Sequence, residues 1–184
     1  MREKVPLEMA TRLLSHGPLV LISSTWEDKI DFTPIAWHMP VSKVPPIVAF
    51  TISEEHFIYK CILNSKDFAV NIPSADIIRE IIQCGTESGA DVDKLKATGL
   101  VAELSRVIKA PVLKSAIAVL ECTLLEDKYL LEHYNIVLGE VKYAEIEPLA
   151  FDGHWLFKNQ DLKTVHHLGD MTFAVPADDV IDLR

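Results

Sequence analysis

The stretch of sequence that decides the fold begins at Phe32 and reads FTPIAWHMPVS through Ser42. On both sides of it lie short apolar segments rich in β-branched and aromatic residues, each bounded by proline or by a polar turn. Pro40 and the Pro45-Pro46 pair bracket a predicted loop, because proline cannot donate to a strand ladder. We predict strands at Pro18–Thr25, Asp31–Met39, Ile47–Ile52, Asp67–Ile72, Ala116–Leu125 and Tyr134–Ile146.

Apolar residues at helical spacing predict helices between these strands. The segments are Leu7–Leu14, His56–Asn64, Ala75–Gln83 and a helical turn at Asp91–Lys96. The two glycines within Cys84–Gly89 are expected to end the third of them, and the polar stretch Glu126–His133 is expected to connect a long hairpin. Helices inserted among successive strands argue against a doubly wound parallel sheet. The predicted fold is mainly β with helical insertions, an antiparallel, closed or nearly closed barrel.

Length and composition limit the number of domains and the classes of function. The chain has 184 residues, 49% of them apolar, which suits one domain over residues 1–184 without a linker or repeat. The formal net charge of −9 and the scattered basic residues argue against binding to nucleic acid. No apolar signal core or membrane-length run is present, and the three cysteines are far apart. We therefore expect a cytoplasmic protein, away from the membrane, with reduced and buried thiols.

The sequence contains no recognised motif for protein-based catalysis. There is no glycine-rich dinucleotide fingerprint, no phosphate-loop lysine and no nucleophile elbow. His166 and His167 are adjacent, so in a strand they point to opposite faces and make a poor metal pair. Glu121 and Glu140 fall in predicted strands and are read as solvent-facing or paired structural residues. We predict no metal and no indispensable catalytic side chain.

A series of motifs in fixed order resembles the flavin reductase-like FMN-binding family, which includes flavoredoxins and some NAD(P)H:flavin and ferric reductases. The resemblance covers roughly residues 5 to 175. Its motifs are Phe32–Ser42, Val44-Pro45-Pro46, Phe50–Ser53, His56-Phe57, Asp67–Pro73, Ser88-Gly89, Asp93-Lys94-Leu95, Gly99-Leu100, Ala110-Pro111-Val112, Leu120-Glu121-Cys122, His133 and Leu138–Val141.

This resemblance implies an FMN-binding split barrel that works as a homodimer with FMN near the interface. The implied function is an oxidoreductase that passes electrons from NAD(P)H or a redox protein to an acceptor such as free flavin or a ferric chelate. Two alternatives stay open. The first is a non-catalytic FMN electron carrier between protein partners, and the second is a flavin-free binding or structural barrel.

The flavin itself dictates which residues are candidates. Its ring needs backbone donors and acceptors along one edge, which suits the strand from Thr33 to Met39, where Pro34 interrupts the ladder. Its phosphate suits hydroxyls beside a helix start, although Glu54-Glu55 places two carboxylates there. The predicted cofactor-binding residues are Thr33, Pro34, Ile35, Ala36, Trp37, His38, Thr51, Ser53, His56, Phe57 and Lys94.

Two of these candidates, Trp37 and Lys94, have alternative readings. Trp37 and His38 are neighbours in the predicted strand, so one of them can face the ring, and Trp37 is equally well read as barrel core. His38 is the candidate for tuning the reduced flavin, because an imidazolium would stabilise negative charge. Lys94 matches a family lysine that approaches the flavin, and it is also readable as a solvated helix charge.

Overall fold

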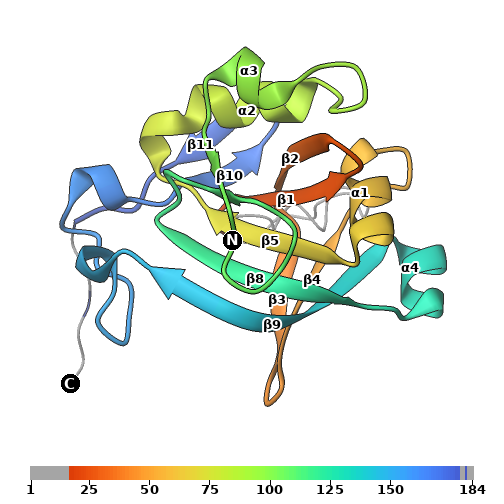
Figure 1. Cartoon of the computed structure of the whole chain (residues 1–184). Coiled ribbons are helices and arrows are strands. Elements are labelled where there is room, and N and C mark those ends of the chain that lie inside the picture. Colours follow the sequence, from red (N-terminus) through yellow and green to blue (C-terminus); the bar gives the residue numbers. More distant parts are fainter. Residues whose placement is uncertain (1–16, 179–180, 182–184) are drawn as a thin grey trace, which may run out of the picture.

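A seven-stranded antiparallel sheet forms the body of the protein (Figure 1). The computed structural model describes residues 17–178 and 181. The strands lie in the order β2-β1-β5-β8-β9-β4-β3, with β2 and β3 at its two ends. Their bounds are β1 Val20–Trp26, β2 Lys29–Ile35, β3 His38–Lys43, β4 Pro46–Thr51, β5 Asp67–Ile72, β8 Ala118–Leu125 and β9 Ile136–Ile146. The predicted antiparallel barrel is confirmed.

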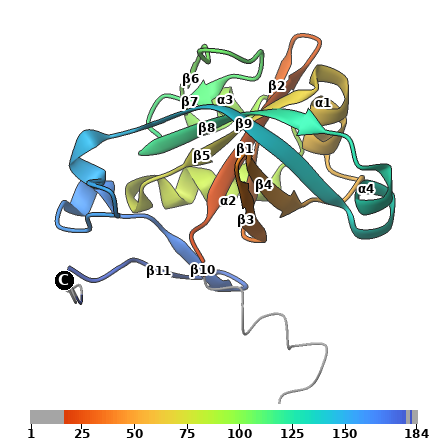
Figure 2. The same cartoon turned by 90° about the horizontal axis from the view of Figure 1, so that it is seen from below.

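Short helices and two small sheets complete the chain. The helices are α1 Phe57–Ser65, α2 Ile78–Thr86, α3 Lys94–Thr98 and α4 Lys128–Tyr134, with single 3-10 turns at η2 Ala75–Ile77, η3 Pro148–Ala150 and η4 Gln160–Leu162. The two-stranded sheets pair β6 Ala102–Glu103 with β7 Val112–Leu113, and β10 His166–Gly169 with β11 Thr172–Ala174. Seen from below, β10 and β11 lie outside the barrel (Figure 2). The predicted helix Leu7–Leu14 lies outside the described residues.

Strand alternation divides the core into two clusters. Val20 and Ile22 of β1 point into the barrel, where Phe50 and Phe68 meet edge to face with ring centroids 5.2 Å apart. Leu21 lies on the opposite face of the same strand, in a second cluster that α2 covers. The sheet therefore carries apolar side chains on both faces of β1, as its uninterrupted apolar sequence predicts.

The three cysteines belong to these cores and are free and buried, as predicted. Burial raises the pKa of Cys84 to about 11, and the pKa values of Cys61 and Cys122 to about 12. All three remain neutral thiols at physiological pH, because burial away from water disfavours the thiolate.

The single strand predicted over Asp31–Met39 is wrong. The chain bends at Ala36, which ends β2 at Ile35, and β3 begins at His38 and pairs with β4 instead. Pro40, predicted to border a loop, lies inside β3, where it is tolerated because β3 is an edge strand. The physical reason for the break is that the two halves pair with opposite ends of the sheet, a choice that local residue preferences do not encode.

Two connections also differ from the predictions. The helix predicted to end at Gln83 continues through Cys84 and Gly85 to Thr86, since packing on the second core cluster outweighs the low helix propensity of one glycine. The polar connection between β8 and β9 contains α4, which Asp127 caps by accepting a hydrogen bond from the Leu130 amide at 3.0 Å. The predicted hairpin of β8 and β9 is otherwise confirmed.

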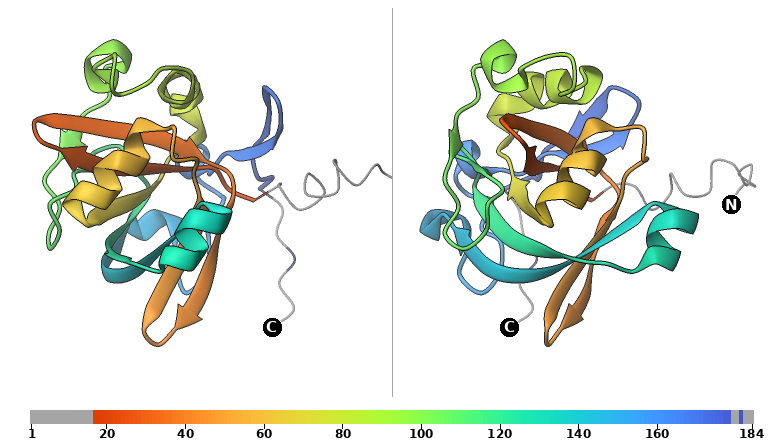
Figure 3. Two further views of the ribbon diagram at one scale, coloured as in Figure 1. Left: turned by 90° about the vertical axis from the view of Figure 1, so that its right-hand side faces the viewer. Right: turned by 45° about the vertical axis from the view of Figure 1, so that its right-hand side comes forward.

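The β3–β4 hairpin projects from the barrel in both views of Figure 3. It carries the exposed apolar side chains Met39, Val41 and Val44, and Val44 at its tip is 91% exposed. Exposed apolar side chains gathered on one hairpin are a feature of surfaces that contact other molecules.

Candidate functional site

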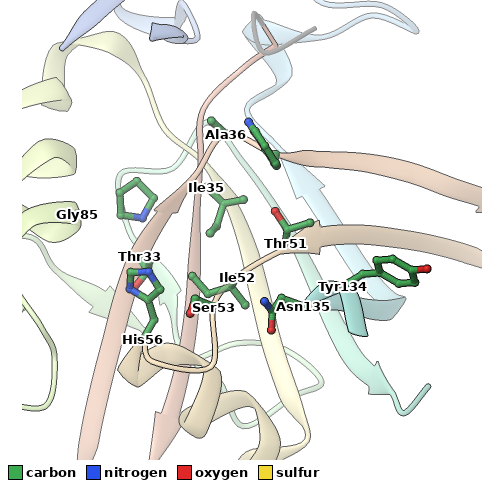
Figure 4. A pocket seen from close by; sticks show the side chains of 12 residues that line it. Thr33, Ile35, Ala36, Thr51, Ile52, Ser53, His56, Gly85, Tyr134 and Asn135 are labelled. Carbon is green, nitrogen blue, oxygen red and sulfur yellow. The ribbon is translucent and has the colours of Figure 1, made fainter. Parts of the chain in front are cut away.

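A cleft of about 460 Å³ opens where the end of β2, the end of β4, the start of α1 and the junction of α4 with β9 meet (Figure 4). Both apolar and polar side chains line it. The lining residues are Thr33, Pro34, Ile35, Ala36, Trp37, Thr51, Ile52, Ser53, His56, Gly85, Tyr134 and Asn135.

Eight predicted cofactor-binding residues meet in this cleft, although they come from two separate stretches of sequence. The first stretch is Thr33–Trp37, and the others are Thr51, Ser53 and His56. The two stretches are joined at the bend, where the Thr51 amide donates to the Trp37 carbonyl at 3.1 Å. The bend that breaks the predicted strand is therefore also what shapes the cleft.

The outer edge of β2 is free of any strand partner, because β2 is the end strand of the sheet. Lys94 donates to the Phe32 carbonyl at 2.9 Å, which shows that this carbonyl points away from β1. Strand alternation places Pro34 on the same free side, so its missing N–H costs no ladder hydrogen bond. The predicted interruption of the ladder at Pro34 is wrong, because β1 pairs with β2 without a break through Pro34 to Ile35. The backbone groups available to a planar ligand are those on the outer edge of β2, which exists because β2 is the end strand.

The start of α1 supplies a second kind of group to the cleft. His56 is the N-cap residue, and its side chain makes no capping hydrogen bond. The first turn contains no acidic residue, and the helix dipole therefore favours an external anion there. The Ser53 hydroxyl accepts from the Glu55 amide at 3.4 Å, which holds it beside this helix start. Glu54 and Glu55 are both exposed to solvent.

Phe57 and Lys94 lie in an adjoining cavity of about 200 Å³ rather than in the main cleft. This cavity shares Thr33, His56 and Gly85 with the cleft. The reading of Lys94 as a solvated helix charge is wrong, because its side chain is 3% exposed and forms an ion pair with Asp31. The lysine is held by β2, an element that is distant from it in sequence.

Trp37 and His38 diverge, as their neighbouring positions predict. Trp37 lines the cleft and is 51% exposed, so the reading of this residue as barrel core is wrong. His38 is not among the residues that line the cleft, and its Nε2 atom instead lies 2.7 Å from the Pro18 carbonyl oxygen. The geometry therefore gives Trp37, and not His38, a direct place beside a ligand.

Four lining residues were not among the sequence candidates: Ile52, Gly85, Tyr134 and Asn135. Gly85 packs closely on β2, since a Cβ atom there would lie 2.8 Å from Cγ of Pro34. Asn135 ends α4 in the left-handed conformation, with φ of 54°, and its carbonyl accepts from the Ile52 amide at 3.0 Å. An asparagine directly after a polar helix could have predicted this left-handed turn from the sequence. It could not have predicted that the turn lines a cleft.

The two strand glutamates prove to be structural, in agreement with one of their sequence readings. Glu121 is buried, and its carboxylate accepts from the Arg106 and Val107 amides, both at 2.7 Å. Glu140 pairs with Lys142 at 2.7 Å. Neither residue lines the cleft.

Within residues 17–178 and 181, no group of three or more His, Cys, Asp or Glu side chains is arranged to hold a metal ion. In the same part of the chain, no helix combines the length and apolar character needed to cross a membrane.

Comparison with solved structures defines the class of protein. The fold superposes on the FMN-binding domain of a flavin reductases-like enzyme from Shewanella baltica with a TM-score of 0.85 and 24% identity, covering 97% of this chain and 95% of the other. It superposes on flavoredoxin of Desulfovibrio vulgaris with a TM-score of 0.84 and 17% identity, covering 100% and 97%. These likenesses place the chain in the fold class of the flavin reductase-like split barrels.

The sequence gives the family. Residues 12–166 match the model of the flavin reductase like domain, and the chain belongs to that family. A relative from Escherichia coli, the uncharacterized protein YddH, is 34% identical over 176 residues, which cover 92% of this chain and 93% of the relative.

Proposed function

We propose that this protein binds FMN in the cleft and acts as an oxidoreductase. In this proposal NAD(P)H or a redox protein supplies electrons, and an acceptor such as free flavin or a ferric chelate receives them. The observation that carries the proposal is that one cleft contains both a free strand edge and an uncapped helix start. These are the two kinds of group that the ring and the phosphate of FMN require.

The residues present fit this cofactor. The volume of about 460 Å³ lies within the range of small-molecule sites. The bend at Ala36 and the free edge of β2 would hold the ring, and Ser53, His56 and the first amides of α1 would hold the phosphate. FMN ends in a single phosphate, and one helix start can bind one such group. We therefore expect the cleft to favour FMN over FAD.

When bound, FMN supplies the chemistry by accepting and releasing electrons or hydride. The residues of the chain bind, orient and shield it. Ile35 and Ile52 give the cleft an apolar floor, while Thr51 fixes the bend through its amide. Cys84 lines the adjoining cavity as a neutral thiol, with its pKa raised to about 11 by burial, so it contributes no thiolate.

The open side of the cleft favours an enzyme over a closed electron carrier. Trp37 and Tyr134 both line the cleft and are 51% and 56% exposed. Two exposed aromatic rings that line the cleft could stack on a second planar reactant, such as nicotinamide or free flavin.

Purified protein, reconstituted if necessary, is expected to release FMN on heating and to be reduced by NADH or NADPH without oxygen. Chromatography of the released cofactor and the anaerobic absorption spectrum measure the two results. FAD at full occupancy, or no flavin after reconstitution, would refute the cofactor assignment. Retained FMN without steady-state oxidation of NADH or NADPH would instead favour the electron carrier.

The projecting β3–β4 hairpin supports the proposal of a homodimer. A second copy that covers Met39, Val41 and Val44 would remove this apolar surface from water. Light scattering at micromolar concentration is expected to give about twice the 20.6 kDa chain mass. Val41→Glu is expected to shift the protein towards monomer, because a carboxylate buried in an apolar contact is costly. A stable wild-type monomer loaded with FMN would contradict the proposal.

A further inference from the structure

A buried ion pair lies directly behind the candidate flavin site. The Lys94 ammonium is 2.7 Å from Oδ1 of Asp31, and the two side chains are 3% and 1% exposed. The same ammonium donates to the Phe32 carbonyl at 2.9 Å. The pair thus ties the first residue of α3 to the edge strand β2, where the sheet itself provides no partner.

Gly89 packs directly against the pair. A Cβ atom at Gly89 would lie 2.5 Å from Oδ1 of Asp31, so only a glycine allows the loop to pass this close to the carboxylate. Charges held away from water are weakly screened, and each one needs its partner. Within this enclosure the carboxylate cancels the charge that the lysine would otherwise present.

The pair reaches the cleft through Thr33. The Thr33 hydroxyl donates to Oδ2 of Asp31 at 3.3 Å and accepts from the Lys94 ammonium at 3.4 Å. Thr33 lines the main cleft, and all three residues line the adjoining cavity that shares His56 and Gly85 with it. A change in the net charge of the pair therefore occurs next to the candidate flavin site.

We propose that Asp31 is a positioning residue that neutralises Lys94 and thereby sets how strongly the site favours reduced over oxidised flavin. This inference rests on the proposed binding of FMN. At mildly alkaline pH the reduced flavin ring carries one more negative charge than the oxidised ring. An unpaired lysine would favour the reduced form, because its positive charge attracts the added negative charge. In the intact pair the Asp31 carboxylate cancels the charge of Lys94, so this preference is lost.

Charge-changing variants test this inference through binding and not through turnover. Apo-protein is titrated with oxidised FMN and, without oxygen, with reduced FMN, and the ratio of the two dissociation constants, oxidised over reduced, is compared. Asp31→Asn is expected to raise this ratio about tenfold, and Lys94→Met to lower it about tenfold. A tenfold change corresponds to about 30 mV for a two-electron couple.

Two further variants complete the comparison. The double variant Asp31→Asn with Lys94→Met restores neutrality, and its ratio is expected within about threefold of wild type. Because it buries no unpaired charge, it keeps the test available if a single variant does not fold. Glu126→Gln is the matched control, since it removes the same charge from the exposed pair with Lys66, and its ratio is expected to stay unchanged.

The outcomes separate this inference from the proposed function. If each single variant weakens both forms equally and leaves the ratio at the wild-type value, the pair is merely structural and the inference is wrong. A double variant whose ratio departs further from wild type than the single variants also overturns it. Wild-type protein that binds neither form of FMN would overturn the proposed function itself.

Discussion

Replacing Lys94 by methionine is expected to lower the free energy of unfolding by about 3–5 kcal/mol. The variant leaves the Asp31 carboxylate 1% exposed and without its cation, with Gly89 packed directly against it. A carboxylate that stays in this poorly solvated site without a partner is costly. Urea unfolding of the apo-protein at neutral pH measures the loss.

Two comparisons make this result specific to the pair. The double variant Asp31→Asn with Lys94→Met is expected to recover most of the loss, because neutral groups of similar size replace both charges. Lys66→Met breaks the exposed pair with Glu126, whose side chains are 49% and 53% exposed, and is expected to cost less than about 1 kcal/mol. Equal losses for Lys94→Met and Lys66→Met would show that burial of the Asp31–Lys94 pair has no energetic consequence.

Replacing Ser53 by aspartate is expected to weaken FMN binding by about a hundredfold or more. Ser53 lines the cleft beside the start of α1, and its backbone carbonyl accepts from the His56 amide at 3.1 Å. A carboxylate there would face the phosphate, and two like charges about 4 Å apart repel by about 4 kcal/mol at an effective dielectric of about 20. Ser53→Ala is expected to weaken binding by only about tenfold, since it removes one hydrogen bond to a charged group.

Fluorescence titration of the apo-proteins with FMN measures these affinities. Ser115→Asp provides the control, because it adds the same charge at an exposed turn that does not line the cleft. Its affinity for FMN is expected to match wild type. If Ser53→Asp, Ser53→Ala and wild type bind FMN equally well, the phosphate lies elsewhere and the assignment of the helix start is wrong.

The sequence by itself determined the elements whose signals are local. The apolar run of β1, the strand β5 closed by Pro73 and the paired runs of β8 and β9 were all predicted, because a strand buried on one or both faces shows this in its own residues. The helix α1 was predicted because its apolar residues recur at helical spacing. The order of these elements was enough to select an antiparallel barrel, and the motif resemblance pointed to eight residues that line the cleft.

Tertiary structure alone decided where the chain bends and what the bend meets. The break at Ala36 follows from pairing β2 with β1 and β3 with β4, at opposite ends of one sheet. Gly85 and Tyr134 reach the cleft from α2 and α4, elements far along the chain that carry no local sign of a ligand site. Such contacts depend on packing between elements, so single-sequence periodicity cannot place them.

The Asp31–Lys94 pair shows this limit most clearly. Lys94 donates a hydrogen bond to the carbonyl of Phe32, a residue 62 positions away in the sequence. In the sequence Lys94 resembles any charged residue at the start of a short helix. Charged residues are normally exposed, so their types give no indication of burial. Only the fold brings α3 onto the free edge of β2 and Gly89 over the carboxylate, and it is this enclosure that turns two ordinary charges into a pair at the wall of the cleft.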